Sequence, residues 1–307
     1  MTQDAGGGAR GPGSDVLGPG VHPQPRTADG FCDPRPSPRA MATPDADGDR
    51  REMVSEDGHL DGDREGGSGD TGAPPSEPTA PAQELLARVR RGEPTGPHRE
   101  ALAGLDEAAL APIRTDRRAA LAFWFNTYNA AAQLLLEARP GLFETRWRFF
   151  RAGAITVAGV ELSLDDIEHG ILRNGRSKYG LGYLPRLART GLGQAYRLAV
   201  DPRIHFALNC GAASCPAILA YEPANVDDAL DEATRRSLDE TVEYDPDRDR
   251  VRLPRVCLWF VGDFGGPGGL RAFLRRFDQI PADASPSLRF HGYDWTRAPR
   301  KFARDPE

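Results

Sequence analysis

The stretch DPRIHFALNCGAASCP, residues 201–216, places reactive side chains where an apolar segment meets a loop. It contains one of the six histidines and two of the four cysteines of the chain. Branched and aromatic residues over 203–208 predict a short, largely buried strand, and the glycine and proline that follow predict a loop. Because chemistry is often found where a rigid element opens into a loop, we expect a functional site here that includes His205, Cys210 and Cys215.

Composition divides the chain into two parts near residue 80. Residues 1–80 hold 15 acidic and 7 basic residues, 15 glycines and 11 prolines, with few large apolar side chains. Such a segment cannot bury enough surface to offset its conformational entropy, so we predict a disordered acidic tail there. We place the folded domain at residues 81–300 and a C-terminal tail at 301–307. Translation from Met41 or Met53 would shorten the first tail.

Charge and cysteine content exclude several classes of protein. The chain totals of 45 acidic and 39 basic residues leave 30 acidic and 32 basic residues outside the tail, so the domain is nearly neutral. A nucleic-acid binder needs a basic face, and we expect no nucleic-acid partner. No apolar run reaches the ~18 residues of a membrane span, and no signal-peptide pattern is present. Four cysteines do not suggest a disulfide scaffold, so we expect a reducing, cytoplasmic location.

Hydrophobic periodicity predicts an α+β fold, a helix-rich single domain around a small, mainly antiparallel sheet. The strongest helix is expected over residues 115–138, with Thr115 as its N-cap. Hairpins are expected over 154–162 and 242–253, and an edge strand over 288–295. Further helices are expected at 82–91, 98–110, 163–173, 225–240, 254–260 and 270–277.

One face of the 115–138 helix carries amide side chains beside aromatic residues. Asn126, Asn129, Gln133 and Glu137 follow one another at helical spacing. For Gln133 and Glu137 we expect a solvated face. For the two asparagines a solvated face and a buried role both stay open, and because asparagine is a mediocre helix former, its position beside phenylalanines favours buried hydrogen bonding.

A second polar pair, Glu168 and His169, lies in the helix expected over 163–173. Neighbours in an α-helix point about 100° apart, so these side chains are not expected to face each other. An ordinary surface or capping role for His169 stays open. Asp263 is a minor site candidate beside Trp259.

Several stretches, in this order, resemble domain-of-unknown-function family 547, which occurs in bacteria, archaea and plants. They are AFWFNTYNA (122–130), LSLDDIEHGILR (162–173), DPRIHFALNCGAASCP (201–216), LWFVGDF (258–264) and YDW (293–295). The resemblance spans most of residues 84–297 and brings no established activity. It implies that Cys215 is less constant among plant members, and that the residues typical of the family are Asn126, Asn129, Glu168, His169, His205 and Cys210.

Because no activity comes with that family, the sequence favours a binding or scaffold module. In this interpretation a buried cluster of His, Asn and Cys side chains holds the core together or contacts an unknown small molecule or protein. No cofactor is predicted, and no membrane partner is expected.

The first alternative is a thiol-dependent hydrolase or acyl transferase. Cys210 would be the nucleophile, and His169 or His205 would help to form its thiolate. On an extended strand His205 and Cys210 would lie roughly 16 Å apart, which makes His169 the better partner. Cys210 exposed in a cleft within reach of His169 would favour this enzyme, whereas Cys210 sealed in apolar packing would favour the scaffold. The remaining catalytic candidates are Glu168, Asn126 and Asn129.

The second alternative is a small zinc site. His205, Cys210 and Cys215, with Glu168 or His169, are of the residue types that bind zinc. The C-x4-C spacing lies at the edge of the usual range, and the sequence offers no second ligand pair.

Overall fold

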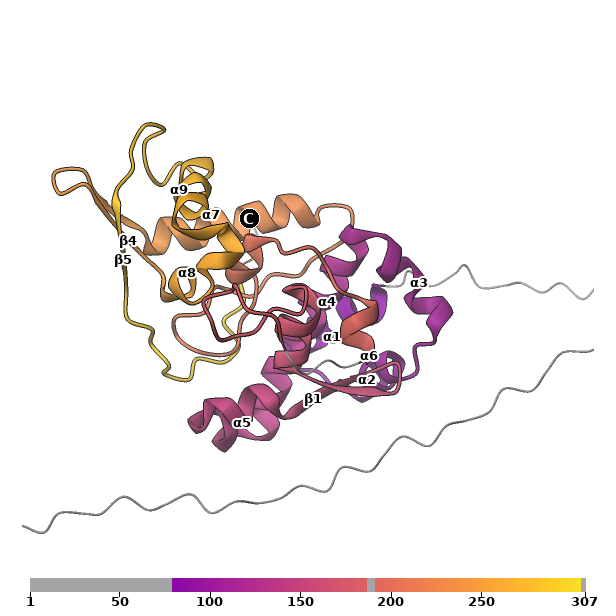
Figure 1. Cartoon of the computed structure of the whole chain (residues 1–307). Helices are drawn as coiled ribbons and strands as arrows, with labels where there is room; N and C mark the ends of the chain where they lie inside the picture. Colours follow the sequence, from indigo (N-terminus) through magenta and orange to yellow (C-terminus); the bar gives the residue numbers. More distant parts are fainter. Residues whose placement is uncertain (1–78, 187–190, 305–307) are drawn as a thin grey trace, which may run out of the picture. The chain divides into compact units, whose positions relative to one another are not determined.

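A computed structural model describes residues 79–186 and 191–304, which belong to one compact unit (Figure 1). The tail predicted for residues 1–80 lies outside the described residues as far as residue 78, and residues 305–307 also lie outside them. The described part is rich in helices and has small, mostly antiparallel sheets, which confirms the predicted fold class.

The elements are α-helices, short 3-10 or π-helical turns and short strands. Those that precede residue 200 are α1 (Ala80–Arg91), α2 (Gly96–Ala103), α3 (Glu107–Thr115), α4 (Arg117–Ala138), η1 (Pro140–Glu144), α5 (Arg146–Arg151), β1 (Gly153–Val157), β2 (Val160–Ser163), η2 (Asp166–Leu172) and α6 (Gly191–Ala195). Those that follow are η3 (Pro202–Phe206), α7 (Val226–Thr241), β3 (Glu243–Asp245), β4 (Arg250–Leu253), α8 (Arg255–Trp259), η4 (Val261–Phe264), α9 (Gly266–Arg276) and β5 (Ser287–Phe290).

Helix α4 is the centre of the larger core cluster and packs against α1, α3, β1, η2 and α7 (Figure 1). Its side chains are largely apolar on all sides, which is the pattern of a helix enclosed by its neighbours, and nearly all of them are buried. The predicted N-cap is wrong by one residue. Asp116 caps α4 by accepting a hydrogen bond from Arg118 N at 2.8 Å, whereas Thr115 ends α3.

The two predicted hairpins are present but belong to separate sheets. Strands β1 and β2 pair antiparallel around Ala158 and Gly159, which both have positive φ, as this two-residue turn requires. Strands β3 and β4 form the second hairpin. The predicted edge strand is shorter than expected and pairs parallel with β4.

The strand predicted over 203–208 is wrong, because Pro202–Phe206 forms the 3-10 helix η3. Asp201 caps this helix by accepting a hydrogen bond from Arg203 N at 3.0 Å, and the fixed φ of Pro202 favours a first helical position. A short apolar run has the same periodicity signal in a buried strand and a buried helix, and here the Asp-Pro pair decides. The distance of roughly 16 Å that an extended strand would give His205 and Cys210 therefore does not apply.

Two further predicted helices differ from the structure, one in its extent and one in its type. The 98–110 segment is divided between α2 and α3. The 163–173 segment forms the π-helix η2, in which Arg173 N donates to Glu168 O, five residues earlier, at 2.8 Å. Ser163 Oγ accepts from Asp166 N at 3.2 Å and so starts this turn. A π-helical turn is uncommon and is frequently found at functional sites.

A second, smaller core cluster forms where α7, β4, α8, η4 and α9 meet. Residues 301–303, which we assigned to a C-terminal tail, pair with Ile218 through hydrogen bonds from Ile218 N to Lys301 O and from Ala303 N to Ile218 O. Within the described ranges, no helix combines the length and apolar character needed to cross a membrane.

Candidate active site

Most of the site residues singled out in the sequence line one cleft of about 670 Å³. Glu168 and His169 come from η2, His205 from η3, and both thiols from the loop that follows η3. The prediction that Glu168 and His169 would not face each other is wrong, because their Oε1 and Nδ1 atoms lie 3.6 Å apart. The reason is that the wider π-helical turn does not have the α-helical angle between neighbours.

Asn126 and Asn129 do not line this cleft. Each is buried and hydrogen-bonds to the backbone of another segment. Asn126 donates to Tyr221 O at 2.8 Å and accepts from Tyr221 N at 3.0 Å. Asn129 donates to Ala207 O at 3.0 Å and accepts from Asn209 N at 2.9 Å. The favoured role for the asparagines, buried hydrogen bonding, is confirmed, and Asn129 fixes the backbone immediately before the thiols.

Of the other two residues on the amide-bearing face of α4, one is buried and one is exposed. Gln133 is buried, so the solvated face that we expected for it is wrong, and it accepts from Arg300 N at 2.7 Å. Glu137 is exposed as expected. Asn209 extends the network by accepting from Gly211 N at 2.8 Å. Asn129 and Asn209 thus position the loop that carries the thiols, and the amide side chains do not line the cleft.

Cys210 and Cys215 form a close pair at the inner end of the cleft, with their Sγ atoms 3.2 Å apart. Cys210 N donates to Cys215 Sγ at 3.3 Å, and Tyr293 Oη lies 3.3 Å from the same sulfur. The hydrogen bond between the two thiols, with a smaller contribution from Tyr293, lowers the pKa of Cys215 to about 6 even though burial opposes this. The same bond, together with burial, raises the pKa of Cys210 well above its usual value. These opposite shifts favour ionisation of Cys215 before that of Cys210.

Glu168 supplies a carboxyl group beside the thiols. Burial raises its pKa to about 7, and Arg173 only partly offsets this effect. Tyr128 Oη donates to Glu168 Oε2 at 3.2 Å, and burial raises the pKa of Tyr128, so its hydroxyl stays protonated. At neutral pH this carboxyl can both donate and accept a proton.

The two histidines are held by a buried ion network around Asp263. Asp263 accepts from Arg173 Nε at 2.6 Å and from Arg176 at 2.9 Å, and lies 2.9 Å from His205 Nε2. Burial raises the pKa of Asp263, but the hydrogen bonds from His205 and Arg173 outweigh it and bring that pKa well below its usual value. His205 therefore presents its proton to Asp263 from Nε2, which leaves Nδ1 as an acceptor.

His169 is engaged on the same network. Its Nδ1 lies 2.8 Å from Arg173 Nη1, and because arginine has only donors, this nitrogen accepts and the proton is on Nε2. Asp165 Oδ1 lies 3.6 Å from that Nε2. Burial and then the Arg173 charge lower the pKa of His169 well below its usual value. His169 is thus a buried neutral imidazole whose acceptor nitrogen is already occupied by Arg173.

Aromatic side chains form the outer wall of the cleft. Trp259, Tyr293 and Trp295 pack together with ring centroids 4.5 to 5.9 Å apart. Arg146 lies over Trp295 at 4.7 Å from its ring centre, and Trp147 at the rim is 56% exposed. The cleft therefore offers an apolar surface that leads to a polar, thiol-containing end.

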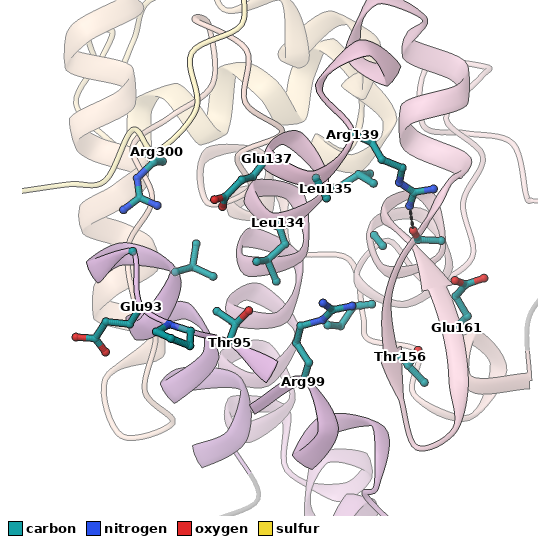
Figure 2. Close-up of a pocket in the computed structure, with 17 residues that line it drawn as sticks. Glu93, Thr95, Arg99, Leu134, Leu135, Glu137, Arg139, Thr156, Glu161 and Arg300 are labelled. Carbon is teal, nitrogen blue, oxygen red and sulfur yellow. Dashed lines mark hydrogen bonds between the residues drawn. The ribbon is translucent and has the colours of Figure 1, made fainter. Parts of the chain in front are cut away.

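A second hollow, of about 550 Å³, has no comparable chemistry (Figure 2). Positively charged arginines and negatively charged glutamates surround it. At its edge Arg139 donates to Gly153 O, as the dashed line in Figure 2 marks. Glu93 is already paired with Arg88 and Arg91. Among its described lining residues there is no cysteine or histidine.

The zinc alternative lacks a suitable ligand cluster in the part of the chain that the structure describes. There, no group of three or more His, Cys, Asp or Glu side chains is arranged to hold a metal ion. His205 Nε2 is directed to Asp263, and Cys215 interacts with Cys210 and Tyr293.

Fold and site together define a helix-rich α+β domain with a dithiol cleft. Residues 112–238 match the family model described as "Protein of unknown function, DUF547", which confirms the resemblance over that segment. The matched segment contains α4, η2 and the thiol loop, whereas Asp263 and Tyr293 lie beyond it. No curated protein and no solved structure matched the chain.

Sequence reasoning missed three partners of the site. Tyr128 of α4 is buried, and its hydroxyl reaches Glu168. Arg173 was expected only to complement the dipole at the C-terminus of its helix, and Tyr293 had no assigned role. Asp263, a minor candidate in the sequence, is the hub of the ion network and lies in η4, next to the helix that carries Trp259.

Proposed function

We propose that this domain is a thiol-dependent hydrolase or acyl transferase, with Cys215 as nucleophile and Cys210 as the donor that stabilises its thiolate. The observation that carries the proposal is the pair of sulfurs 3.2 Å apart at the inner end of a cleft. A thiolate is the reactive form of cysteine, and here three hydrogen-bond donors converge on one sulfur. This cleft favours an enzyme over the scaffold module that the sequence favours.

The proposed reaction begins with attack of Cys215 Sγ on the carbonyl carbon of an acyl group. A thioester forms, the bond to the leaving group breaks, and the leaving group takes a proton from Glu168, whose pKa of about 7 suits this role. Water or an acceptor alcohol, amine or thiol then attacks the thioester and returns a proton to Glu168. The Tyr293 hydroxyl, 3.3 Å from Cys215 Sγ, is a candidate donor to the oxyanion.

His205 supports this chemistry through its pairing with Asp263. Asp263 accepts the hydrogen bond from Nε2 and so leaves Nδ1 as an acceptor, which could hold the attacking water or acceptor while Glu168 takes its proton. The arrangement of an acid that orients a histidine beside a nucleophile follows the logic of other nucleophilic enzymes. The histidine that we preferred on the strand geometry, His169, has its acceptor nitrogen, Nδ1, already occupied by Arg173.

The aromatic wall supports an apolar acyl group as substrate. Trp259, Trp295 and Phe150 line the same cleft as the thiols, and aromatic surfaces bind apolar chains through buried area. We therefore expect faster reaction with longer acyl chains than with acetyl.

The experiment is acylation of the full chain by 4-nitrophenyl acetate and 4-nitrophenyl octanoate, read by nitrophenol release and peptide mass. The expected result is a burst, an acyl group on Cys215 and slower turnover, all lost in Cys215→Ser. Cys257→Ala is the matched control, because Cys257 is buried in the second core cluster away from the cleft. Absence of an adduct on the cleft thiols, with the fold intact, would return the scaffold or binding module to first place.

A further inference from the structure

The thiol loop has a geometry suited to a second kind of chemistry. Cys215 N donates to Ala212 O at 3.0 Å, so the chain turns back on itself between the two cysteines. Gly211 has φ +89, and a Cβ at this position would lie 2.1 Å from Leu136 Cδ1. Glycine is therefore required for this close approach, and the loop is fixed against α4 with its two sulfurs together.

We propose that Cys210 and Cys215 form a reversible intramolecular disulfide when a small peroxide enters the cleft, so that the pair is an oxidative modification site. The sulfurs need to approach from 3.2 Å to a bond length of about 2.05 Å. The inference does not depend on the proposed acyl chemistry, because it concerns the thiols themselves. Disulfides in reducing compartments are typically transient and redox-sensing, which fits a pair that opens and closes.

Access distinguishes these two thiols from the third described cysteine. Cys210 and Cys215 are 7% and 3% exposed and line the 670 Å³ cleft, which is wide enough for a peroxide. Cys257 is fully buried among the apolar side chains of the second core cluster. Oxidation is expected to follow thiolate character and access, so the pair should react while Cys257 is protected.

The steps balance with hydrogen peroxide as the oxidant. Cys215 thiolate attacks one peroxide oxygen, the O–O bond breaks, and the released hydroxide takes a proton to become water, which leaves Cys215 as a sulfenic acid. Cys210 Sγ then attacks Cys215 Sγ, the S–O bond breaks, and the leaving hydroxide takes the Cys210 proton as a second water. The two thiols lose two electrons in total, and one peroxide is reduced to two waters.

Oxidation would also remove the thiolate from the cleft. A disulfide has no free nucleophile, so Cys210 and Cys215 would be inert toward thiol reagents until a reductant such as dithiothreitol restores both thiols by exchange.

The test uses hydrogen peroxide on the reduced full chain, followed by alkylation and tryptic mapping. Both cleft thiols lie in one tryptic peptide, 204–235, whereas Cys257 lies in 256–271 and Cys32 in 27–39. The expected result is that peptide 204–235 loses two hydrogens and both alkylation sites before the other two cysteines change, and that dithiothreitol reverses this.

Variants separate the two steps. In Cys210→Ser the sulfenic acid at Cys215 has no partner and should be trapped by dimedone, whereas Cys257→Ala should leave the disulfide yield unchanged. The proposal is overturned if peptide 204–235 of the unmodified chain instead gains oxygen while Cys210 stays alkylatable, or if the pair resists oxidation until the protein unfolds. Because the first readout uses the natural sequence and needs no substrate, neither a misfolded variant nor the absence of acyl transfer obscures the outcome.

Discussion

His205 Nε2 lies 2.9 Å from Asp263 Oδ2, although the two residues are 58 positions apart in the chain. The same carboxylate holds Arg173, and the side chains of Arg173 and Asp263 are fully buried. One acidic group therefore compensates a buried guanidinium and orients a histidine of the cleft. Positions on η2, η3 and η4 are tied together through this single residue.

We predict that Asp263→Asn destabilises the domain by about 3–5 kcal/mol, because breaking a buried ion pair leaves an uncompensated charge. Urea unfolding followed by circular dichroism measures this loss. Asp245→Asn is the matched control, because Asp245 pairs with Arg248 and Arg250 at the surface and exposed pairs contribute little. Similar losses in both variants would contradict the hub role of Asp263.

The two asparagines of α4 give a pair of predictions, one for each backbone segment to which they hydrogen-bond. Asn129→Ala frees the amide of Asn209, and Asn126→Ala frees the amide of Tyr221, since each loses its acceptor oxygen. Each variant should lose about 1–3 kcal/mol for the buried groups left unpaired. Hydrogen exchange should accelerate at residue 209 only in the first variant and at residue 221 only in the second. Acceleration at both sites in both variants would mean that the amides do not hold separate segments.

Local patterns predicted the regular parts of this fold. Helix α4 and both hairpins follow from periodicity and from the Ala158-Gly159 turn, because these signals lie within one segment. A helix was predicted where η2 lies, but its π-helical type was not, and η3 was predicted as a strand, because a short apolar run does not distinguish a strand, an α-helix and a tighter or wider helix. Burial of Gln133 was missed for a related reason, since its partner Arg300 N is 167 residues away.

The candidate site was predictable in its residue types but not in its pairings. Cys210, His205, Glu168 and His169 do line one cleft. Their roles depend on partners from distant segments, such as Arg173 with Asp263, 90 residues apart, and Cys215 with Tyr293, 78 residues apart. No spacing rule within a segment encodes such contacts, so the choice between two thiols and two histidines needed the structure.

Thiol reactivity should report which cysteine carries the charge. Alkylation of Cys215 by iodoacetamide should rise with pH through about 6 and then level off, whereas an ordinary thiol titrates near 8.5. Cys210→Ala should move this midpoint upward because Cys215 loses its closest donor, and Tyr293→Phe should move it upward by less. Because both cleft thiols lie in peptide 204–235, fragment-ion spectra of that peptide separate the two sites, with Cys257 as the internal reference, since burial raises the pKa of Cys257 to about 12. A midpoint near the ordinary value in the natural sequence would contradict a thiolate at Cys215.

Titration of Glu168 should make the free energy of unfolding depend on pH, and comparison with Glu168→Gln should show the direction of this dependence. Its pKa is about 7 in the folded protein against 4.5 for an ordinary glutamate, so the folded state binds the extra proton between these values. That contribution is fully present below pH 4.5 and is lost as pH rises through 7. At 1.36 kcal/mol per pKa unit it amounts to about 3 kcal/mol.

The comparison with Glu168→Gln isolates this effect. Burial lowers the pKa values of His169 and His205, which gives the opposite slope. Both histidines are present in both proteins, so the difference removes their common contribution and leaves that of Glu168 together with its coupling to His169, 3.6 Å away. The stability of Glu168→Gln relative to the natural sequence should therefore increase by about 3 kcal/mol between pH 4.5 and pH 8. Urea unfolding at half-unit pH steps measures that difference. A difference that stays flat over this range would mean that Glu168 is ionised at neutral pH and cannot serve as the acid of the proposed reaction.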